Sequence, residues 1–149
     1  RVNELLRERA STLGVTMTVR DGVRDDALDR SLEAIVRDRD RGLVVGLTAA
    51  MLPHRDRVVR FAADRKLPAI YARREYVAAG GLMYYGADTA PLFVKTAEYV
   101  HRIATGTRPG DLPVEQPMAV KSALNRKAAR ALGIAVPPAI LAGVEEVLD

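Results

Sequence analysis

Polar and aromatic side chains follow a short apolar run, Leu-Pro-Ala-Ile-Tyr, near the middle of the chain. The guanidinium of Arg73 or Arg74 could hold a carboxylate through two parallel hydrogen bonds. The ring of Tyr71 or Tyr76 could form one wall of an apolar subsite. The alternative is that the two arginines and Glu75 simply face solvent, and their spacing alone favours that interpretation. What favours a binding role is the position of this segment in the expected fold.

Thr48 and Asp88 occupy equivalent positions, because each comes after another short apolar run. Leu-Val-Val-Gly-Leu precedes Thr48, and Leu-Met-Tyr-Tyr-Gly lies just before Asp88. In an open α/β sheet, ligands bind outside the carboxyl ends of the strands, where such side chains converge. Asp88 has a second explanation as the cap of the helix that follows it. We therefore predict a ligand site made of side chains at the strand ends: Thr48, Tyr71, Arg73, Arg74, Glu75 and Asp88.

A catalytic or metal-dependent site finds little support in the residue types. The chain has no Cys, and its serines lack the glycine pattern of a nucleophile elbow. His54 and His101 each lie in a charged helical segment without a carboxylate or second histidine at i+4. Gly80 and Gly81 precede a strand, whereas a phosphate-binding glycine loop leads from a strand into a helix. We expect no catalytic residue, no metal and no cofactor.

The charge pattern argues against a nucleic-acid partner. The sequence has 23 Lys+Arg and 19 Asp+Glu, a formal net charge of +4. Basic residues alternate with acidic ones, as in Arg-Asp-Arg-Asp-Arg at 37–41, which is typical of a solvated helix surface. No run approaches the roughly 18 to 20 apolar residues of a membrane span, and the first residues show no signal peptide. We expect a globular chain.

The first half of the chain predicts helices and strands in alternation. Apolar spacing indicates helices at 2–13, 26–36 and 53–63 and strands at 15–19, 43–47 and 67–71. Gly14 lies where a left-handed residue would end the first helix, and Asp25 or Asp26 could cap the second. Pro53 suits the first turn of the third. This rhythm favours right-handed βαβ units and a parallel sheet.

The second half is more broken. A strand at 82–86 is followed by a long helix that ends at Gly106. Residues 108–117 contain three prolines and a glycine, and this composition predicts a stiff extended connector. Beyond it we expect a weak strand at 118–124, a short helix capped by Asn125 and a last helix over 139–148.

Several of these segments together resemble a known family. They are Leu67-Pro-Ala-Ile-Tyr71, Gly80-Gly-Leu-Met83, Tyr85-Gly86, Tyr99-Val100 with Ile103 and Gly106, Leu112-Pro-Val-Glu-Gln-Pro117, and Ala131-Leu-Gly133 with Val136-Pro137. The pattern is similar to the C-terminal half of ABC transporter substrate-binding proteins of the tryptophan/tyrosine type. Leu-Pro-Val-Glu-Gln-Pro is its most specific part, and residues 1–66 match only in the rhythm of the elements.

The resemblance implies an α/β fold: a three-layer parallel-sheet lobe of a type I periplasmic binding protein, flavodoxin-like or Rossmann-like and truncated. Residues 1–75 and 116–149 would form the C-terminal ligand-binding lobe. Residues 76–115 would contain hinge crossings and a strand and helix that belong to the N-terminal lobe. The crossings would lie near Gly80 and at 112–117.

The function that the resemblance implies is non-catalytic capture of a small ligand, an amino acid or related organic solute, for an ABC-type importer. The partners would be that ligand and an ABC permease, and the location periplasmic or extracytoplasmic. A truncated chain would leave the strand at 82–86 and the next helix uncovered, which predicts a homodimer, domain-swapped in one form. The alternative is a stand-alone flavodoxin-like or receiver-like interaction module, although Thr48 stands where a receiver would need a phosphoacceptor Asp.

Overall fold

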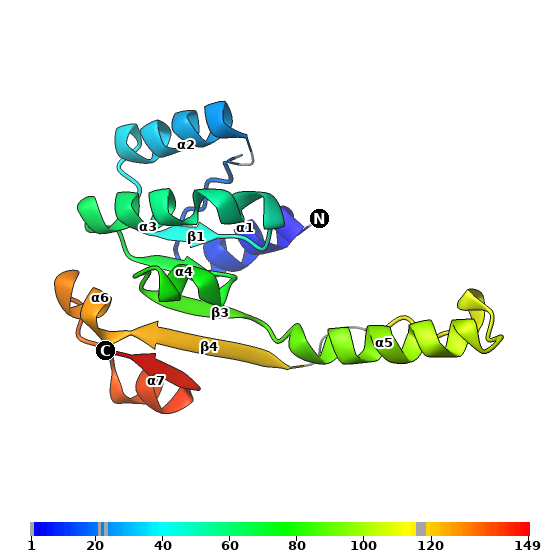
Figure 1. The fold of residues 1–149 in the computed structure, drawn as a ribbon. Helices are drawn as coiled ribbons and strands as arrows, with labels where there is room; N and C mark the ends of the chain where they lie inside the picture. The colour runs from blue at the N-terminus through cyan, green and yellow to red at the C-terminus, as the bar shows by residue number, and fades with distance from the viewer. Residues whose placement is uncertain (1, 21, 23, 116–118) are drawn as a thin grey trace. The chain divides into compact units, whose positions relative to one another are not determined.

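The computed structural model describes residues 2–20, 22, 24–115 and 119–149. The chain divides into two compact units, Arg1–Asp40 and Arg41–Asp149. We describe each unit by itself. Helices and strands are labelled in Figure 1.

The first unit contains two helices, α1 (Val2–Thr12) and α2 (Asp25–Arg37). Gly14 ends the first helix region with a φ of 68°, which confirms the expected left-handed residue. The strand expected at 15–19 does not form. The described residues of this unit offer it no strand to pair with, and an alternating sequence cannot make a ladder alone. The residue before α2 is Arg24, whose side chain makes no capping hydrogen bond.

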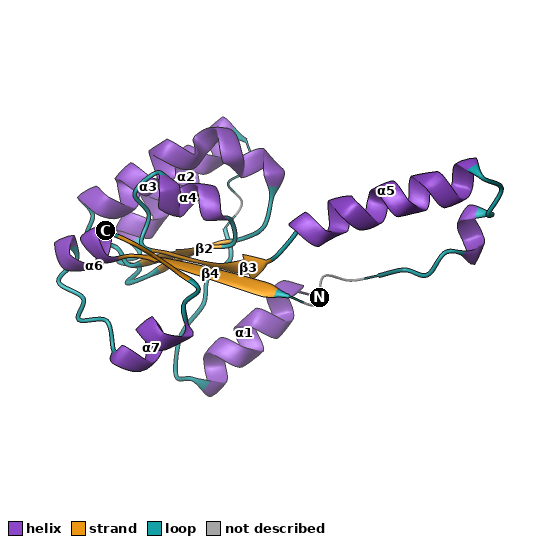
Figure 2. Ribbon diagram, turned by 60° about the horizontal axis from the view of Figure 1, so that its bottom comes forward, coloured by secondary structure: helices purple, strands orange, loops and turns teal. Residues whose placement is uncertain are grey.

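The second unit is built on a five-stranded sheet in the order β1-β2-β3-β4-β5. Its strands are β1 (Leu43–Val45), β2 (Ala69–Tyr71), β3 (Met83–Ala87), β4 (Val120–Asn125) and β5 (Glu146–Leu148). Neighbouring strands are parallel except β3 and β4, which are antiparallel. Figure 2 shows β2, β3 and β4 side by side. The expected α/β class is confirmed, and the sheet is mostly rather than wholly parallel.

The helices of this unit connect the strands. They are the 3-10 helix η1 (Ala49–His54), α3 (Arg55–Asp64), α4 (Arg74–Ala78), α5 (Ala90–Ala104), the 3-10 turn η2 (Pro109–Asp111), α6 (Arg126–Ala131) and α7 (Pro138–Gly143). Pro53 lies inside η1 and not in the first turn of α3, because a 3-10 turn precedes this helix. Asn125 caps α6 as expected: its Oδ1 accepts from the Ala128 N–H at 2.9 Å.

The last expected helix, over 139–148, is wrong in its second half. The helix α7 ends at Gly143, and residues 146–148 form β5. This strand pairs with β4, with Glu146 opposite Ala123 and Leu148 opposite Asn125. The backbone hydrogen bonds of that long-range pairing replace those of a helix, and local periodicity does not register them.

The core lies where α4 packs against β2, β3 and β4. Tyr71, Tyr76 and Val77 are each 1% exposed. The rings of Tyr71 and Tyr76 are stacked with centroids 4.8 Å apart, and the Tyr76 hydroxyl donates to the Met51 carbonyl at 2.9 Å. Gly81 runs against this pair, and a Cβ at that position would lie 2.6 Å from Cε2 of Tyr71. Gly81 is therefore needed for close packing.

The strand expected to leave for another lobe is instead the centre of this sheet. β3 lies between β2 and β4, so it presents no free edge, and the part of the dimer argument based on that edge does not hold. The next element, α5, has no buried residue, and Phe93 and Val100 are 75% and 61% exposed. Figures 1 and 2 show α5 continuing from the end of β3. The homodimer remains a prediction that rests on this helix.

The connector runs back beside α5. The Tyr99 hydroxyl lies 2.8 Å from the Pro113 carbonyl oxygen and 3.0 Å from Oε1 of Glu115, and its single proton is available to either acceptor. η2 gives the start of the connector a turn, so it is not extended throughout. Its end, 116–117, and the first expected residue of the strand at 118–124 lie outside the described residues. Among the helices described, none is long and apolar enough to cross a membrane.

Candidate functional site

The sheet brings several charged side chains to one edge. β1, β2 and β3 are mutually parallel, so their carboxyl ends lie at the same edge. β4 runs the other way and therefore begins there, with Lys121 opposite Gly86. We call this the strand-end edge, and it contains Thr48, Arg73, Glu75, Asp88 and Lys121.

Arg73 and Glu75 form an ion pair where β2 turns into α4. Arg73 has extended backbone angles (φ −139°, ψ 137°) just before the helix, and its Nη2 lies 3.1 Å from Oε1 of Glu75. The Nε of Arg73 is buried and has no hydrogen-bond partner among the described residues. The pKa of Glu75 is lowered by its own backbone N–H and by Arg73, against the opposing effect of burial. Glu75 is therefore a carboxylate near neutral pH.

Arg74 has a different partner. Its Nε donates to Oε2 of Glu146 at 2.7 Å, and its Nη2 donates to the other carboxylate oxygen. This two-point contact raises the pKa of Arg74 and lowers the pKa of Glu146. Glu146 is the first residue of β5, so Arg74 connects α4 to the edge strand. Two neighbouring donors of Arg74 are thus paired within the protein, and its place in a ligand site stays a prediction.

Asp88 lies at the end of β3 and makes two contacts. Its Oδ1 accepts from the Ala90 N–H, the first of α5, at 3.1 Å. The N-cap position itself is Thr89 and not Asp88 as expected. Its Oδ2 lies 3.1 Å from Nζ of Lys121. The Ala90 N–H, followed by Lys121, lowers the pKa of Asp88. Sequence reasoning missed Lys121 as a site residue, although a lone charge inside an apolar strand was a visible signal.

Thr48 and Tyr71 differ in accessibility. Thr48 is half-buried and precedes η1, with its carbonyl accepting from the Met51 N–H at 3.4 Å. Tyr71 is 1% exposed, and burial raises its pKa to about 12. Its ring stacks on Tyr76 in the core. Both tyrosine rings are thus packed in the core, and a ligand wall formed by either of them stays a prediction.

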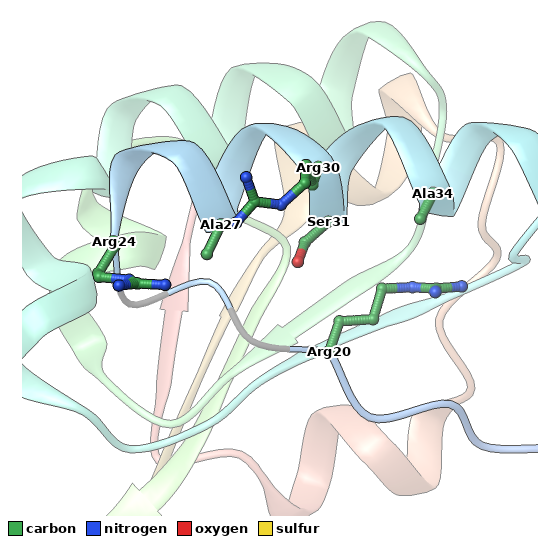
Figure 3. Close-up of a pocket in the computed structure, with 6 residues that line it drawn as sticks. All are labelled: Arg20, Arg24, Ala27, Arg30, Ser31 and Ala34. Carbon is green, nitrogen blue, oxygen red and sulfur yellow. The ribbon is translucent and has the colours of Figure 1, made fainter.

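The first unit carries an open pocket of about 260 Å³ on α2 and the segment before it (Figure 3). Its lining contains three arginines, Arg20, Arg24 and Arg30, and three small residues, Ala27, Ser31 and Ala34. Arg20 lies 2.9 Å from Asp38 and 2.8 Å from Asp40. Arg24 and Arg30 both approach Asp26. Each of the three arginines therefore has a carboxylate partner within the first unit.

Metal binding has no support in the parts of the chain that are described. They contain no group of three or more His, Cys, Asp or Glu side chains placed to hold an ion. The strand-end edge instead offers alternating positive and negative groups, which can pair with a small polar ligand. In open α/β sheets that bind ligands, the site lies at this edge of the sheet.

Comparison with known proteins identifies the family. The profile of the family described as ABC transporter substrate binding protein matches residues 23–148. The chain belongs to this family. No curated protein matches the sequence.

Three solved structures show the same fold. A conserved domain protein from Vibrio cholerae has a TM-score of 0.88 and 25% identity, over 98% of this chain and 49% of its own. An ABC domain in complex with L-Trp from Streptococcus pneumonia has a TM-score of 0.85 and 23% identity, and the match covers 97% of this chain and 50% of that protein. A ligand-free, open substrate binding protein with adhesive properties from Clostridium difficile has a TM-score of 0.63 and 23% identity, over 97% and 48%. The chain spans about half the length of each of these proteins.

Proposed function

We propose that this protein is the solute-binding component of an ABC-type importer and captures a small ligand without altering it chemically. The observation that carries the proposal is the family match over residues 23–148. The ABC permease is then the membrane partner, and the location is periplasmic or extracytoplasmic. The charged side chains of the strand-end edge are consistent with binding and do not form an arrangement that activates a nucleophile.

The ligand class is an amino acid or a related organic solute. Arg73 and Lys121 supply positive charge at the strand-end edge, while Glu75 and Asp88 supply negative charge. A zwitterion carries both complementary groups on one small molecule, so it matches such an edge better than a uniformly charged ligand does. A similar fold is known in complex with L-Trp, which makes aromatic amino acids the first ligands to test.

The division into lobes is part of the same proposal. Residues 1–75 and 116–149 belong to the C-terminal ligand-binding lobe, and 76–115 contain the hinge crossings and the excursion toward the N-terminal lobe. The position of β3 between β2 and β4 supports an excursion made of α5 and its connector. The lack of any buried residue on α5 supports a further surface that covers it.

A thermal-shift screen tests the function. The chain and the complete protein that its gene encodes are each heated with amino acids, purines and small carboxylates at increasing concentration. A ligand that binds the native state raises the midpoint with its concentration by mass action. We expect at least one amino acid to raise it in the complete protein. Midpoints unchanged by every ligand in both proteins would refute solute binding and favour the interaction-module alternative.

A further inference from the structure

The two neighbouring arginines differ in how many of their donors the protein uses. A guanidinium binds a carboxylate best through two parallel hydrogen bonds from neighbouring nitrogens. Arg74 makes this contact with Glu146 inside the protein. Arg73 makes a single contact, from Nη2 to Glu75. The capacity of Arg73 for a second oxygen is therefore unused.

The unused donor of Arg73 lies in an unfavourable environment. Its Nε is shielded from water and has no hydrogen-bond partner among the described residues. A buried N–H without an acceptor is unfavourable, and the more so on a charged group. The side chain as a whole is 30% exposed, so a ligand can approach it from solvent, and the atoms that cover Nε must move for Nε to take part. A small carboxylate seated beside Nε and Nη2 would supply the missing acceptor.

Glu75 is placed to give way to such a ligand. Its side chain is 42% exposed and touches Arg73 through one oxygen at 3.1 Å. Partly exposed ion pairs of this kind contribute little to stability, because water and salt screen them. Exchanging this contact for a two-point contact with a ligand is therefore favourable. The displaced Glu75 carboxylate then lies near the ligand and can accept from its ammonium group.

We propose that Arg73, and not Arg74, binds the carboxylate of the ligand, and that Glu75 occupies Arg73 in the absence of ligand. The proposal rests on the solute-binding function and names the residue that recognises the carboxylate group of the ligand. In the ligand-free protein, the carboxylate of Glu75 thus takes the place on Arg73 that the ligand carboxylate occupies in the complex. The Arg74–Glu146 pair, one position along the chain, is then purely structural.

The test is calorimetric titration of the complete protein with matched pairs of probes. The pairs are L-tryptophan with tryptamine, L-phenylalanine with phenethylamine, and L-leucine with isoamylamine, in which the second member lacks the carboxylate. We expect Arg73→Gln to weaken binding of an amino acid about tenfold or more, as loss of charge-assisted hydrogen bonds does. Binding of the corresponding amine should stay the same. Arg74→Gln is the matched control and should change neither.

Two further measurements separate binding from folding. Arg73→Lys keeps the charge but loses the Nε donor, so it should recover only part of the affinity. In the unmodified protein, the Nε–H signal of Arg73 in a ¹H–¹⁵N spectrum should shift on addition of L-tryptophan, while that of Arg74 should not. Circular dichroism and urea midpoints of the variants check that each one is folded.

The outcomes are distinct. Equal amino-acid affinity in the Arg73→Gln variant and the unmodified protein overturns the assignment of Arg73 while the solute-binding function stands. If Arg73→Gln weakens binding of the amino acid and of the matching amine equally, the assignment is also overturned, because the carboxylate is then not the group that Arg73 binds. If inorganic phosphate binds more strongly than any amino acid and Arg73→Gln abolishes that binding, the group that Arg73 binds is a phosphate, and the carboxylate assignment is overturned. A protein that binds none of the probes refutes the proposed function together with this inference.

Discussion

Replacing Gly81 by alanine should destabilise the second unit strongly. The added Cβ would lie 2.6 Å from Cε2 of Tyr71 and 2.8 Å from the carbonyl oxygen of Tyr76, where ordinary contacts begin at 3.4 Å. Neither neighbour can move easily. The Tyr71 ring is stacked on Tyr76, and the Tyr76 carbonyl accepts from the Gly81 N–H at 2.8 Å.

Overpacking of this kind costs about 1–3 kcal/mol in the free energy of unfolding. We expect a loss near the upper end, about 2–3 kcal/mol, because one of the two clashes is with backbone. Alanine also lowers the entropy of the unfolded chain, which returns about 0.4–1 kcal/mol and is included in that figure. With a urea m-value of about 1–3 kcal/mol per molar, the unfolding midpoint should fall by about 0.7–3 M.

The assay is urea unfolding followed by circular dichroism, with Gly46→Ala as the matched control. A Cβ at Gly46 would meet nothing within 4 Å, and the φ of Gly46 lies outside the left-handed region. The free energy of unfolding of this variant should equal that of the unmodified chain to within about 0.5 kcal/mol. Equal midpoints for Gly81→Ala and Gly46→Ala would show that Gly81 is not held against the tyrosine pair.

Substitutions at three further positions test the core and the start of a helix. Tyr76→Phe removes the hydroxyl that donates to the Met51 carbonyl and should cost about 1 kcal/mol by urea unfolding; an unchanged midpoint would argue against that bond. Asn125→Ala removes the acceptor of the Ala128 N–H and should also cost about 1 kcal/mol, whereas Asn125→Asp should retain most of the stability. Burial raises the pKa of Tyr71 from 10.0 to about 12, because the folded protein favours the neutral phenol. The stability that Tyr71 contributes to the folded state is therefore complete below pH 10 and is lost as pH rises to 12. Urea midpoints from pH 9 to 11.5 should therefore fall less steeply for Tyr71→Phe, and parallel pH profiles would contradict the burial effect.

The first parallel strands were predictable because their sequences carry local signals. Each is a short apolar run bounded by turn or helix signals, as in Leu-Val-Val before Gly46, and such runs are recognisable without alternation. Val44 of that run is nonetheless 61% exposed, because β1 is an edge strand of the sheet. β5 was not predictable on the same grounds. Its pairing with β4 depends on residues far away in the chain, such as Glu146 opposite Ala123, and the local sequence suits a helix equally well. The segment at 15–19 shows the opposite case, in which alternation is present and a partner strand is not.

The candidate site was predictable in position but not in detail. Parallel topology places Arg73 and Asp88 at one edge of the sheet, and the sequence order already implied this. Which arginine remains available depends on Glu146, which is distant in sequence and reaches Arg74 only through β5. Whether Tyr71 faces a ligand or the core depends on the ring of Tyr76. Such choices are made by tertiary packing, and residue spacing does not contain them.

The pairing of β3 with β4 has a consequence for the architecture of the whole chain. Ala87 and Val120 are register partners, and the Asp88 N–H donates to the Ala119 carbonyl at 2.9 Å. The two strands are thus an antiparallel hairpin whose turn has been expanded into the entire segment from 88 to 119. Closing a longer loop costs only about 0.6 kcal/mol for each doubling of its length. The sheet can therefore carry a large insertion at this point for little free energy, and α5 can vary in length and partner without any change in the register that positions Arg73 and Asp88.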